Sequence, residues 1–403
     1  MHLARIGAGS LCVLAACTVG DGGPLDPPRP GDSVDGVVDV PLTGDDGYVY
    51  TAQLEIAQQA FQVQLDTGST TLALAGPACP TCSVSPVYMP GASATDDHQM
   101  ASTTYGDQSS WVGEVFDDDV ALGATAAVPV ELAAMTEQTD FFQLGNALQG
   151  ILGLGPDQLL DPDTTSFASE LFATGVPSVM SFRMCRDHGD LWLGGTDADA
   201  MAAPAVYTPM LPIAPAQPFY AVSIASMGYA GTTLGGAEDF GAMIVDTGTS
   251  FSFVPDPIAS ALASQINASP GYQQLFGSQT IGGASCVTTT ATPAQIDASL
   301  PMLDVRFPDG AGGTNELDLP ATRSYLYDNG GGSWCLDVLS NDGLGVTIMG
   351  DTMQMAMTTV FDVANQRIGF APEAGCGNEH VSADVRRHVE PSHDPRFHPP
   401  RRR

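Results

Sequence analysis

Lysine is missing from this chain of 403 residues, and all 13 of its basic residues are arginine. They stand against 46 acidic residues, so the formal net charge at pH 7 is -33. Such a polyanion repels phosphate backbones, which excludes nucleic acid as a partner class. Acid or salt would relieve the self-repulsion of the chain, so an acidic or saline environment fits the composition. The acidic composition is explained equally well by a surface that Asp and Glu keep soluble, with no special environment.

The apolar stretch at the N-terminus is too short for a transmembrane helix. It runs from Ile6 to Ala16 behind Arg5 and has the length of a secretory leader. Its end, Leu14-Ala15-Ala16-Cys17, resembles the bacterial lipobox, in which the cysteine receives lipid. We therefore expect residues 1–17 to form a lipoprotein signal peptide with its lipobox cysteine. The leader exports the protein, and Cys17 becomes the lipidated N-terminus that anchors it to a bacterial cell envelope. A plain secretory leader with an incidental cysteine is the alternative.

The two segments outside the central part lack apolar periodicity. Residues 18–36 are rich in Pro, Gly and Asp and are expected to form a disordered tether. Thr18 follows the cysteine at the position where an Asp would favour retention in the inner membrane. We therefore expect the protein on the outer membrane, facing the periplasm or the exterior. Residues 377–403 hold six Arg and four His and are also expected to be disordered. This tail has no role, contacts anionic lipids, or docks onto the acidic body as a brake.

Composition favours strands over long helices in the remaining part. The chain is 43% hydrophobic and contains 45 Gly and 30 Pro, which suits many short strands joined by turns. Its length allows one large two-lobed domain or two ordinary ones. We expect an all-β body.

An internal repeat stands out. Residues 61–77 (FQVQLDTGSTTLALAGP) and 241–257 (GAMIVDTGTSFSFVPDP) align without a gap, each as strand, Asp-Thr-Gly, hydroxyl residue and strand. Each copy is followed by a second apolar element that contains glycine, at 150–155 and at 346–351. A single Asp-Thr-Gly would usually mean only a turn. Two copies in matching contexts indicate a duplicated structure.

The repeat predicts chemistry based on two acids, Asp66 and Asp246. Two carboxylates brought together across a pseudo-two-fold axis cannot easily both ionise, so the pair holds one proton. One member can then take a proton from a water molecule while the other donates to a carbonyl oxygen. This chemistry requires neither metal nor cofactor. The sequence leaves open which of the two carries the proton.

The neighbouring residues suit support of these acids. Glycines allow a tight turn whose amides approach the carboxylates, and threonine hydroxyls can bond across the symmetry axis. The hydroxyl residues after the glycines can donate to the outer carboxylate oxygens. The two glycines are Gly68 and Gly248, and the two threonines are Thr67 and Thr247. The hydroxyl residues that follow the glycines are Ser69 and Thr249.

These residues resemble the pepsin-like aspartic proteases from about residue 47 to residue 376. The resemblance implies a bilobal, all-β acid protease fold with pseudo-two-fold related lobes at 37–213 and 214–376 and a cleft between them. It implies an aspartic endopeptidase that cleaves polypeptides with Asp66 and Asp246, and we expect a monomer. The segment 104–109 is similar to the flap hairpin of the family, so Tyr105 and Gly106 would cover the substrate.

Some positions depart from the family pattern. Ala73 stands where the family usually has a Trp that hydrogen-bonds the flap Tyr, and Trp111 on the expected hairpin is the candidate to replace it. Gln108 occupies a position where a flap Gly is common, and Gln149 one where an Asp often stands.

Eight cysteines are present, and six remain once Cys12 and the lipidated Cys17 are set aside. The family resemblance implies the bridges Cys79–Cys82 and Cys286–Cys335, which leaves Cys185 and Cys376 as the third pair. A metal or redox role for Cys79 and Cys82 is the weaker interpretation, because no second CxxC or His-rich cluster accompanies them in the body.

Two further functions share some of these features. A catalytically silent peptide-binding or inhibitor module can use the same fold, since a fold alone does not confer activity. A structural envelope lipoprotein would explain the leader and the tether but not the duplicated acids.

Overall fold

The structure is a computed structural model that describes residues 36–44, 48–142, 148–159, 164–214, 217–283, 285–355 and 357–376. The predicted leader with Cys17, the tether up to residue 35 and the tail 377–403 lie outside these residues. None of the helices in these ranges combines the length and the hydrophobicity of a membrane-spanning helix.

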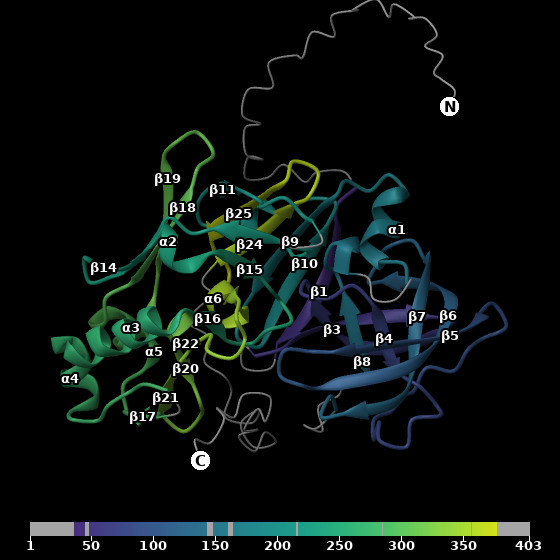
Figure 1. The fold of residues 1–403 in the computed structure, drawn as a ribbon, viewed down its shortest axis with the longest axis horizontal. Coiled ribbons are helices and arrows are strands. Elements are labelled where there is room, and N and C mark those ends of the chain that lie inside the picture. Colours follow the sequence, from purple (N-terminus) through teal and green to yellow (C-terminus); the bar gives the residue numbers. More distant parts are fainter. Residues whose placement is uncertain are drawn as a thin grey trace, which may run out of the picture.

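The strands of the described ranges form four sheets, and the largest sheet has 13 strands. It runs through the N-terminal lobe, on the right of Figure 1, and continues into the centre of the molecule. In spatial order its strands are β11 (Val206–Pro209), β25 (Arg367–Pro372), β24 (Met357–Asp362), β9 (Val179–Met184), β10 (His188–Leu193), β1 (Val38–Gly44), β2 (Tyr50–Ile56), β3 (Gln59–Asp66), β8 (Gly150–Gly153), β4 (Leu72–Ala75), β7 (Val128–Thr139), β6 (Ser110–Leu122) and β5 (Thr95–Thr104).

The other three sheets belong to the C-terminal lobe, on the left of Figure 1. The first contains β12 (Ala221–Ser223), β15 (Ala242–Val245), β23 (Thr347–Met349), β16 (Ser252–Val254) and β22 (Val338–Ser340). The second contains β14 (Thr232–Gly236), β13 (Ser226–Tyr229), β18 (Leu303–Pro308) and β19 (Thr314–Leu319). The third contains β17 (Val287–Thr288), β21 (Ser333–Leu336) and β20 (Leu326–Asp328).

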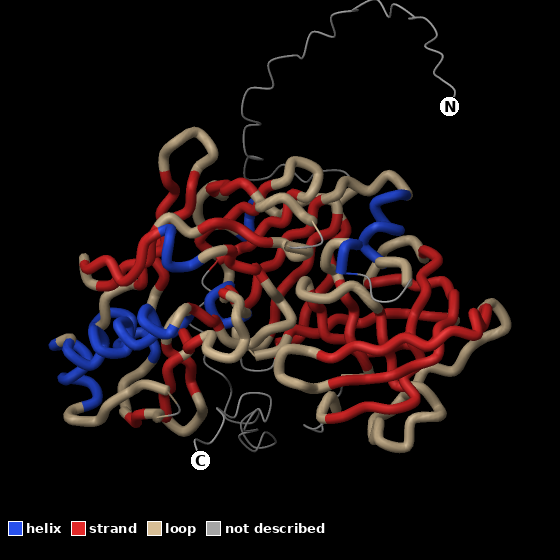
Figure 2. The backbone as a smooth tube through the Cα atoms, viewed as in Figure 1, coloured by secondary structure: helices blue, strands red, loops and turns tan. Residues whose placement is uncertain are grey.

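Helices are short and gather mainly on the outer side of the C-terminal lobe (Figure 2). The longest, α3, buries Ile258, Leu262 and Ile266, which recur every fourth residue on one face. The α-helices are α1 (Phe167–Ala173), α2 (Ala237–Phe240), α3 (Asp256–Ala268), α4 (Pro270–Phe276), α5 (Pro293–Ser299) and α6 (Asp351–Gln354). The 3-10 turns are η1 (Asp157–Leu159), η2 (Ala198–Ala200) and η3 (Ala321–Arg323).

The local sequence fits the turn between β2 and β3 and the burial of the strands around it. Strands β2 and β3 meet at a two-residue turn in which Ala57 and Gln58 have φ angles of 49° and 68°, the left-handed conformation that tight hairpins require. Apolar side chains alternate along β2, so one face of that strand is buried. Every residue of β4 and β8 is buried, because these strands lie inside the lobe.

The two lobes repeat one arrangement of strands. In the N-terminal lobe β8 pairs parallel with β3 and antiparallel with β4, and β4 pairs parallel with β7. In the C-terminal lobe β23 pairs in the same senses with β15 and β16, and β16 pairs parallel with β22. The duplicated sequence segments thus form equivalent structures, and the prediction of a two-lobed, mainly β fold is confirmed.

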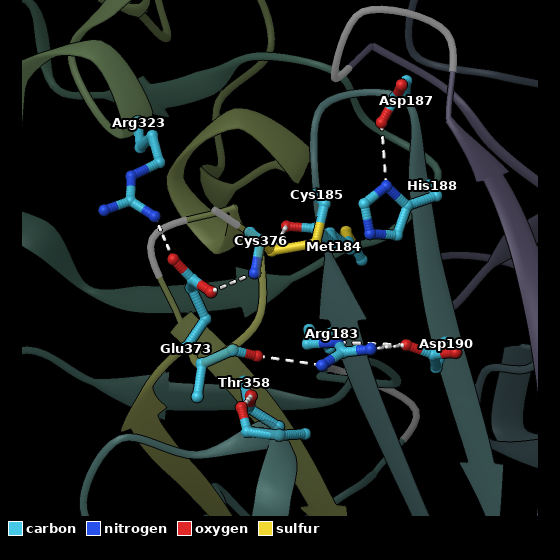
Figure 3. The surroundings of a disulfide bond; sticks show 12 residues. Arg183, Met184, Cys185, Asp187, His188, Asp190, Arg323, Thr358, Glu373 and Cys376 are labelled. Carbon is cyan, nitrogen blue, oxygen red and sulfur yellow. Dashed lines mark hydrogen bonds and ion pairs between the residues drawn. A yellow bond between two sulfur atoms is a disulfide. The ribbon is translucent and has the colours of Figure 1, made fainter. Parts of the chain in front are cut away.

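A disulfide joins the far end of the described chain to the central strands. Cys376 bonds Cys185 across a sequence separation of 191 residues. Figure 3 shows the ion pair of the Arg183 guanidinium with the Asp190 carboxylate near this disulfide. Arg183 also donates to the carbonyl of Ala374 at 2.8 Å. Glu373 accepts from the Cys376 amide at 3.1 Å. This segment is therefore tied to β9 and β10 by covalent and polar contacts.

The remaining disulfides each lie within one lobe. They join Cys79 with Cys82 and Cys286 with Cys335, and all three pairs in the structure match the pairs expected from the sequence.

Replacing both Cys185 and Cys376 with Ser should lower the free energy of unfolding by about 2–4 kcal/mol, because a long loop in the unfolded chain is no longer closed. Urea or thermal unfolding of the double variant measures the loss. The matched control is the Cys79→Ser, Cys82→Ser pair, whose separation of 3 residues predicts a smaller loss. Equal losses in the two double variants would contradict the interpretation.

Candidate active site

Asp66 and Asp246 lie at equivalent ends of two strands that face each other across the lobes. Asp66 is the last residue of β3, and Asp246 directly follows β15. Both are buried, with exposed fractions of 4% and 8%. The structure therefore brings together the two acids that the repeat singled out.

Two threonines lock the loops to each other. The Thr67 hydroxyl accepts from the Thr247 amide at 3.0 Å and donates to the carbonyl of Val245 at 3.0 Å. In the mirrored pattern the Thr247 hydroxyl accepts from the Thr67 amide at 3.1 Å and donates to the carbonyl of Leu65 at 3.0 Å. These reciprocal bonds are completely buried, so they fix the distance between the loops.

Each carboxylate receives the same two hydrogen bonds from its own loop. The Gly68 amide donates to Asp66 Oδ1 at 2.7 Å, and the Ser69 hydroxyl donates to Asp66 Oδ2. The equivalent bonds run from the Gly248 amide to Asp246 Oδ1 at 2.8 Å and from the Thr249 hydroxyl to Asp246 Oδ2 at 2.5 Å. The two acids are thus held in the same orientation about the pseudo-two-fold axis.

The acids approach so closely that only glycine fits opposite each of them. A Cβ atom on Gly248 would lie 2.1 Å from Asp66 Oδ1, and one on Gly68 would lie 2.7 Å from Asp246 Oδ1. Burial raises the pKa of Asp66 well above its usual range, and the negative charge of Asp246 raises it further. The pair therefore retains a proton under conditions in which an exposed carboxyl group has lost its own.

Two glutamines donate hydrogen bonds to backbone carbonyls of the loop that contains Asp246. The sequence did not predict either contact. Gln64 donates to the carbonyl of Gly248 at 3.2 Å, from one lobe to the other. Gln354 on α6 donates to the carbonyls of Asp246 at 3.1 Å and Met349 at 3.2 Å. Gln62 and Gln64 alternate with apolar residues in the run before Asp66, so no local signal distinguishes Gln64.

The hairpin of β5 and β6 forms the predicted flap. Its turn is closed by a bond from the Tyr105 amide to the carbonyl of Ser109 at 2.9 Å, and Asp107 accepts from the Ser109 amide at 2.9 Å. Gln108 has a φ of 72°, which explains why a glycine suits this position. A Cβ on Gly106 would lie 3.6 Å from Leu344 Cδ2, so the flap tip faces the opposite lobe.

Trp111 holds the flap tyrosine in place. Its Nε1 donates to the Tyr105 hydroxyl at 2.9 Å, and the Tyr105 ring stacks on Phe141 with centroids 5.7 Å apart. Ala73 is buried in the same apolar cluster as Trp111. Burial and the charge of Asp66 raise the pKa of Tyr105, so its hydroxyl stays neutral. Trp111 therefore makes the bond expected of the missing Trp at position 73.

These elements enclose a cleft of about 640 Å³ between the lobes. Asp66 and Asp246 lie in it, under Tyr105, Gly106 and Asp107 of the flap. Its apolar walls come from both lobes: Phe141, Ile151 and Leu159 on one side, and Phe219, Ile244, Phe253, Leu344, Val346 and Ile348 on the other. In the part of the chain that the structure describes, no three His, Cys, Asp or Glu side chains are grouped so that they could hold a metal ion.

Comparison with known proteins places this arrangement in a family. The family model described as "Eukaryotic aspartyl protease" matches residues 47–373. An "Aspartic protease" of Phaffia rhodozyma is 25% identical over 328 residues, covering 80% of this chain and 76% of the relative. "Penicillopepsin-1" of Penicillium janthinellum is 27% identical over 353 residues, covering 83% of this chain and 97% of the relative. The chain belongs to the pepsin-like aspartyl protease family.

Proposed function

We propose that this aspartic protease hydrolyses peptide bonds with a water molecule that Asp66 and Asp246 activate. The observation that carries the proposal is the mirrored geometry of the two acids, in which each carboxylate lies against the glycine of the opposite loop. In each loop an amide donates to Oδ1 and a hydroxyl donates to Oδ2, so the two acids are held in matching orientations. A water molecule bound between the two acids would reach both.

The reaction needs one proton on the pair. The ionised member accepts a proton from the water as the oxygen attacks the scissile carbonyl carbon, and the protonated member donates to the carbonyl oxygen. The product of this step is a neutral tetrahedral diol. The acid that took the water proton then gives it to the amide nitrogen, while the other acid takes a proton from a diol hydroxyl. The C–N bond breaks to give a carboxylic acid and an amine, and the pair returns to its starting protonation. The raised pKa of Asp66 supports this cycle because it keeps one proton in the site.

The cleft and the flap favour an extended polypeptide as substrate. The apolar walls on both sides of the acids suit apolar side chains on either side of the scissile bond. Closure of the flap over the bound peptide would exclude water other than the one between the acids. A silent peptide-binding module of the same fold would not require two fully hydrogen-bonded acids in the cleft.

Asp66→Asn and Asp246→Asn should each lower kcat/KM by about 10²–10⁴-fold, because either change removes a proton donor or acceptor. Cleavage of a denatured protein is measured from acidic to neutral pH, with and without a statine-type inhibitor. Asp256→Asn, an exposed position at the start of α3, is the matched control and should retain parental activity. Cleavage that survives both active-site substitutions would overturn the assignment.

Trp111→Phe should lower kcat/KM by about fivefold, because Tyr105 loses a hydrogen bond worth about 1 kcal/mol. Steady-state kinetics on a peptide substrate measure the change. Trp334→Phe is the control for loss of a buried indole: Trp334 is as buried as Trp111 but lies in the C-terminal lobe on β21. Equal activity of Trp111→Phe and the parent would show that the bond does not position the flap.

We also propose that Cys17 carries the lipid that anchors the protein to a bacterial envelope. The lipobox resemblance of residues 14–17 supports this proposal. In a bacterial host, Cys17→Ser should abolish incorporation of labelled fatty acid and release the protein from membranes. Cys12→Ser, inside the leader, should leave both unchanged. Lipid label on the Cys17→Ser protein would refute the proposal.

A further inference from the structure

Asp337 is a buried acid that the mechanism above does not use. It lies between β21 and β22 and has an exposed fraction of 0%. Its amide donates to the carbonyl of Tyr325 at 2.9 Å, which fixes the backbone. Among the ion pairs of the described residues, none includes Asp337, and its Oδ1 has no hydrogen-bond partner there. A charged carboxylate in such a place is strongly disfavoured.

The hydrogen bonds of Thr352 on α6 indicate which form Asp337 takes. The Thr352 hydroxyl lies within hydrogen-bond distance of Asp337 Oδ2 and of the Ser250 carbonyl, at 3.0 Å from the latter. A hydroxyl has one proton, and a carbonyl oxygen can only accept. Both contacts are hydrogen bonds if the Asp337 carboxyl group is protonated and donates to Thr352, which donates in turn to Ser250.

This relay ends at the catalytic loop of the C-terminal lobe. Ser250 follows Thr249, whose hydroxyl donates to Asp246. The Ser250 carbonyl also accepts from the Thr352 amide at 3.1 Å, and the Ser250 hydroxyl donates to the carbonyl of Tyr48 in the other lobe at 2.5 Å. The orientation of the peptide at Ser250 thus affects both Asp246 and the contact between lobes.

We propose that Asp337 is a positioning residue whose protonated carboxyl group orients the Thr249–Ser250 loop through Thr352 and whose ionisation limits activity as the pH rises. When Asp337 loses its proton, the Thr352 hydroxyl turns to the carboxylate and its bond to Ser250 breaks. The loop that holds Asp246 then loses one of its supports. This inference rests on the proposed function of Asp246.

The surroundings of Asp337 favour the neutral form. Burial raises the pKa of Asp337 well above its usual range, and this effect outweighs the lowering by a hydrogen bond that Thr352 donates to the ionised carboxylate. Strands β16 and β21 present no acidic or basic side chain. The charged or titratable residues on the other elements around it are Asp256 on α3, Asp351 on α6, Tyr325 before β20, Tyr327 and Asp328 on β20 and Arg323 on η3. Arg323 is paired with Glu373, and Asp328 with Arg186.

Asp337→Asn tests the proposal, because an amide keeps a donor for Thr352 but cannot ionise. We expect kcat/KM at acidic pH to remain within about twofold of the parent, since the donor is retained. The decline of kcat/KM at the alkaline side should shift to higher pH. Asp318→Asn, an exposed position on β19, is the matched control and should leave the profile unchanged. An unshifted alkaline limb for Asp337→Asn would overturn the proposal.

Thr352→Val removes the relay hydroxyl and should reduce kcat/KM by about fivefold at acidic pH, where the relay is intact, and by less at higher pH, where the parent has already lost the bond to Ser250. Thr352→Ser restores the hydroxyl and should restore both the rate and the pH profile. If Thr352→Val and the parent have the same pH profile and rate, the relay does not position the loop and the proposal fails.

Thermal unfolding separates ionisation from positioning. Because the folded-state pKa of Asp337 is raised, its contribution to stability is complete below about pH 4, the ordinary carboxyl range, and is lost as the pH rises toward the folded-state pKa. The thermal unfolding midpoint of Asp337→Asn, compared with that of the parent at the same pH, should therefore rise as the pH increases. This rise without a shifted activity profile would assign Asp337 a purely structural role.

Binding of a statine-type inhibitor separates this inference from the proposed function. It requires a positioned Asp246 but no turnover, and its loss at high pH should shift in Asp337→Asn as the activity does. A parent protein that binds the inhibitor but cleaves nothing would overturn the proposed function, and the shift in binding would still support the role of Asp337. Binding with the same pH profile in both proteins would overturn that role.

Discussion

Two buried acids that repel each other must be held at a fixed separation, and the rest of the structure depends on this constraint. The reciprocal bonds between Thr67 and Thr247 do so from inside the molecule, where no water competes for them. The glycines beside the acids remove the steric barrier to close approach. Movement of either loop would change the separation of the acids, on which the proposed sharing of one proton depends.

The two lobes have the same structure near the acids and different structures farther away. Both lobes present the same strand pairings and the same amide and hydroxyl donors to the carboxylates. Farther out, the N-terminal lobe builds the long flap hairpin with Tyr105 and Trp111. The C-terminal lobe instead packs α6 and Asp337 against the loop that follows Asp246. One copy of the duplicated structure thus extends a hairpin over the cleft, while the other contacts a buried acid.

Positive charge is scarce, and two of the arginine ion pairs, Arg186–Asp328 and Arg323–Glu373, join distant parts of the chain. Each of the five arginines in the described ranges forms an ion pair, at Arg183, Arg186, Arg306, Arg323 and Arg367. Arg186 joins the turn between β9 and β10 to Asp328 in the C-terminal lobe. Arg183 holds the segment before Cys376. In a chain with a net charge of -33, these contacts relieve repulsion where the lobes pack together.

Sequence alone determined the duplication and the two acids, because repeats and short motifs around Asp66 and Asp246 record them locally. The two-lobed fold and the cysteine pairs were predicted through the family resemblance that these motifs carry. The sequence also indicated Trp111, because Ala73 left the flap tyrosine without its usual partner. The roles of Gln64, Gln354 and Asp337 were decided only by the tertiary structure. Each acts through a carbonyl or hydroxyl group far away in the chain, as Asp337 does through Thr352, and no local pattern encodes such a contact. Burial, which turns Asp337 from a surface charge into a neutral donor, is likewise a property of the packed lobe and not of the residue.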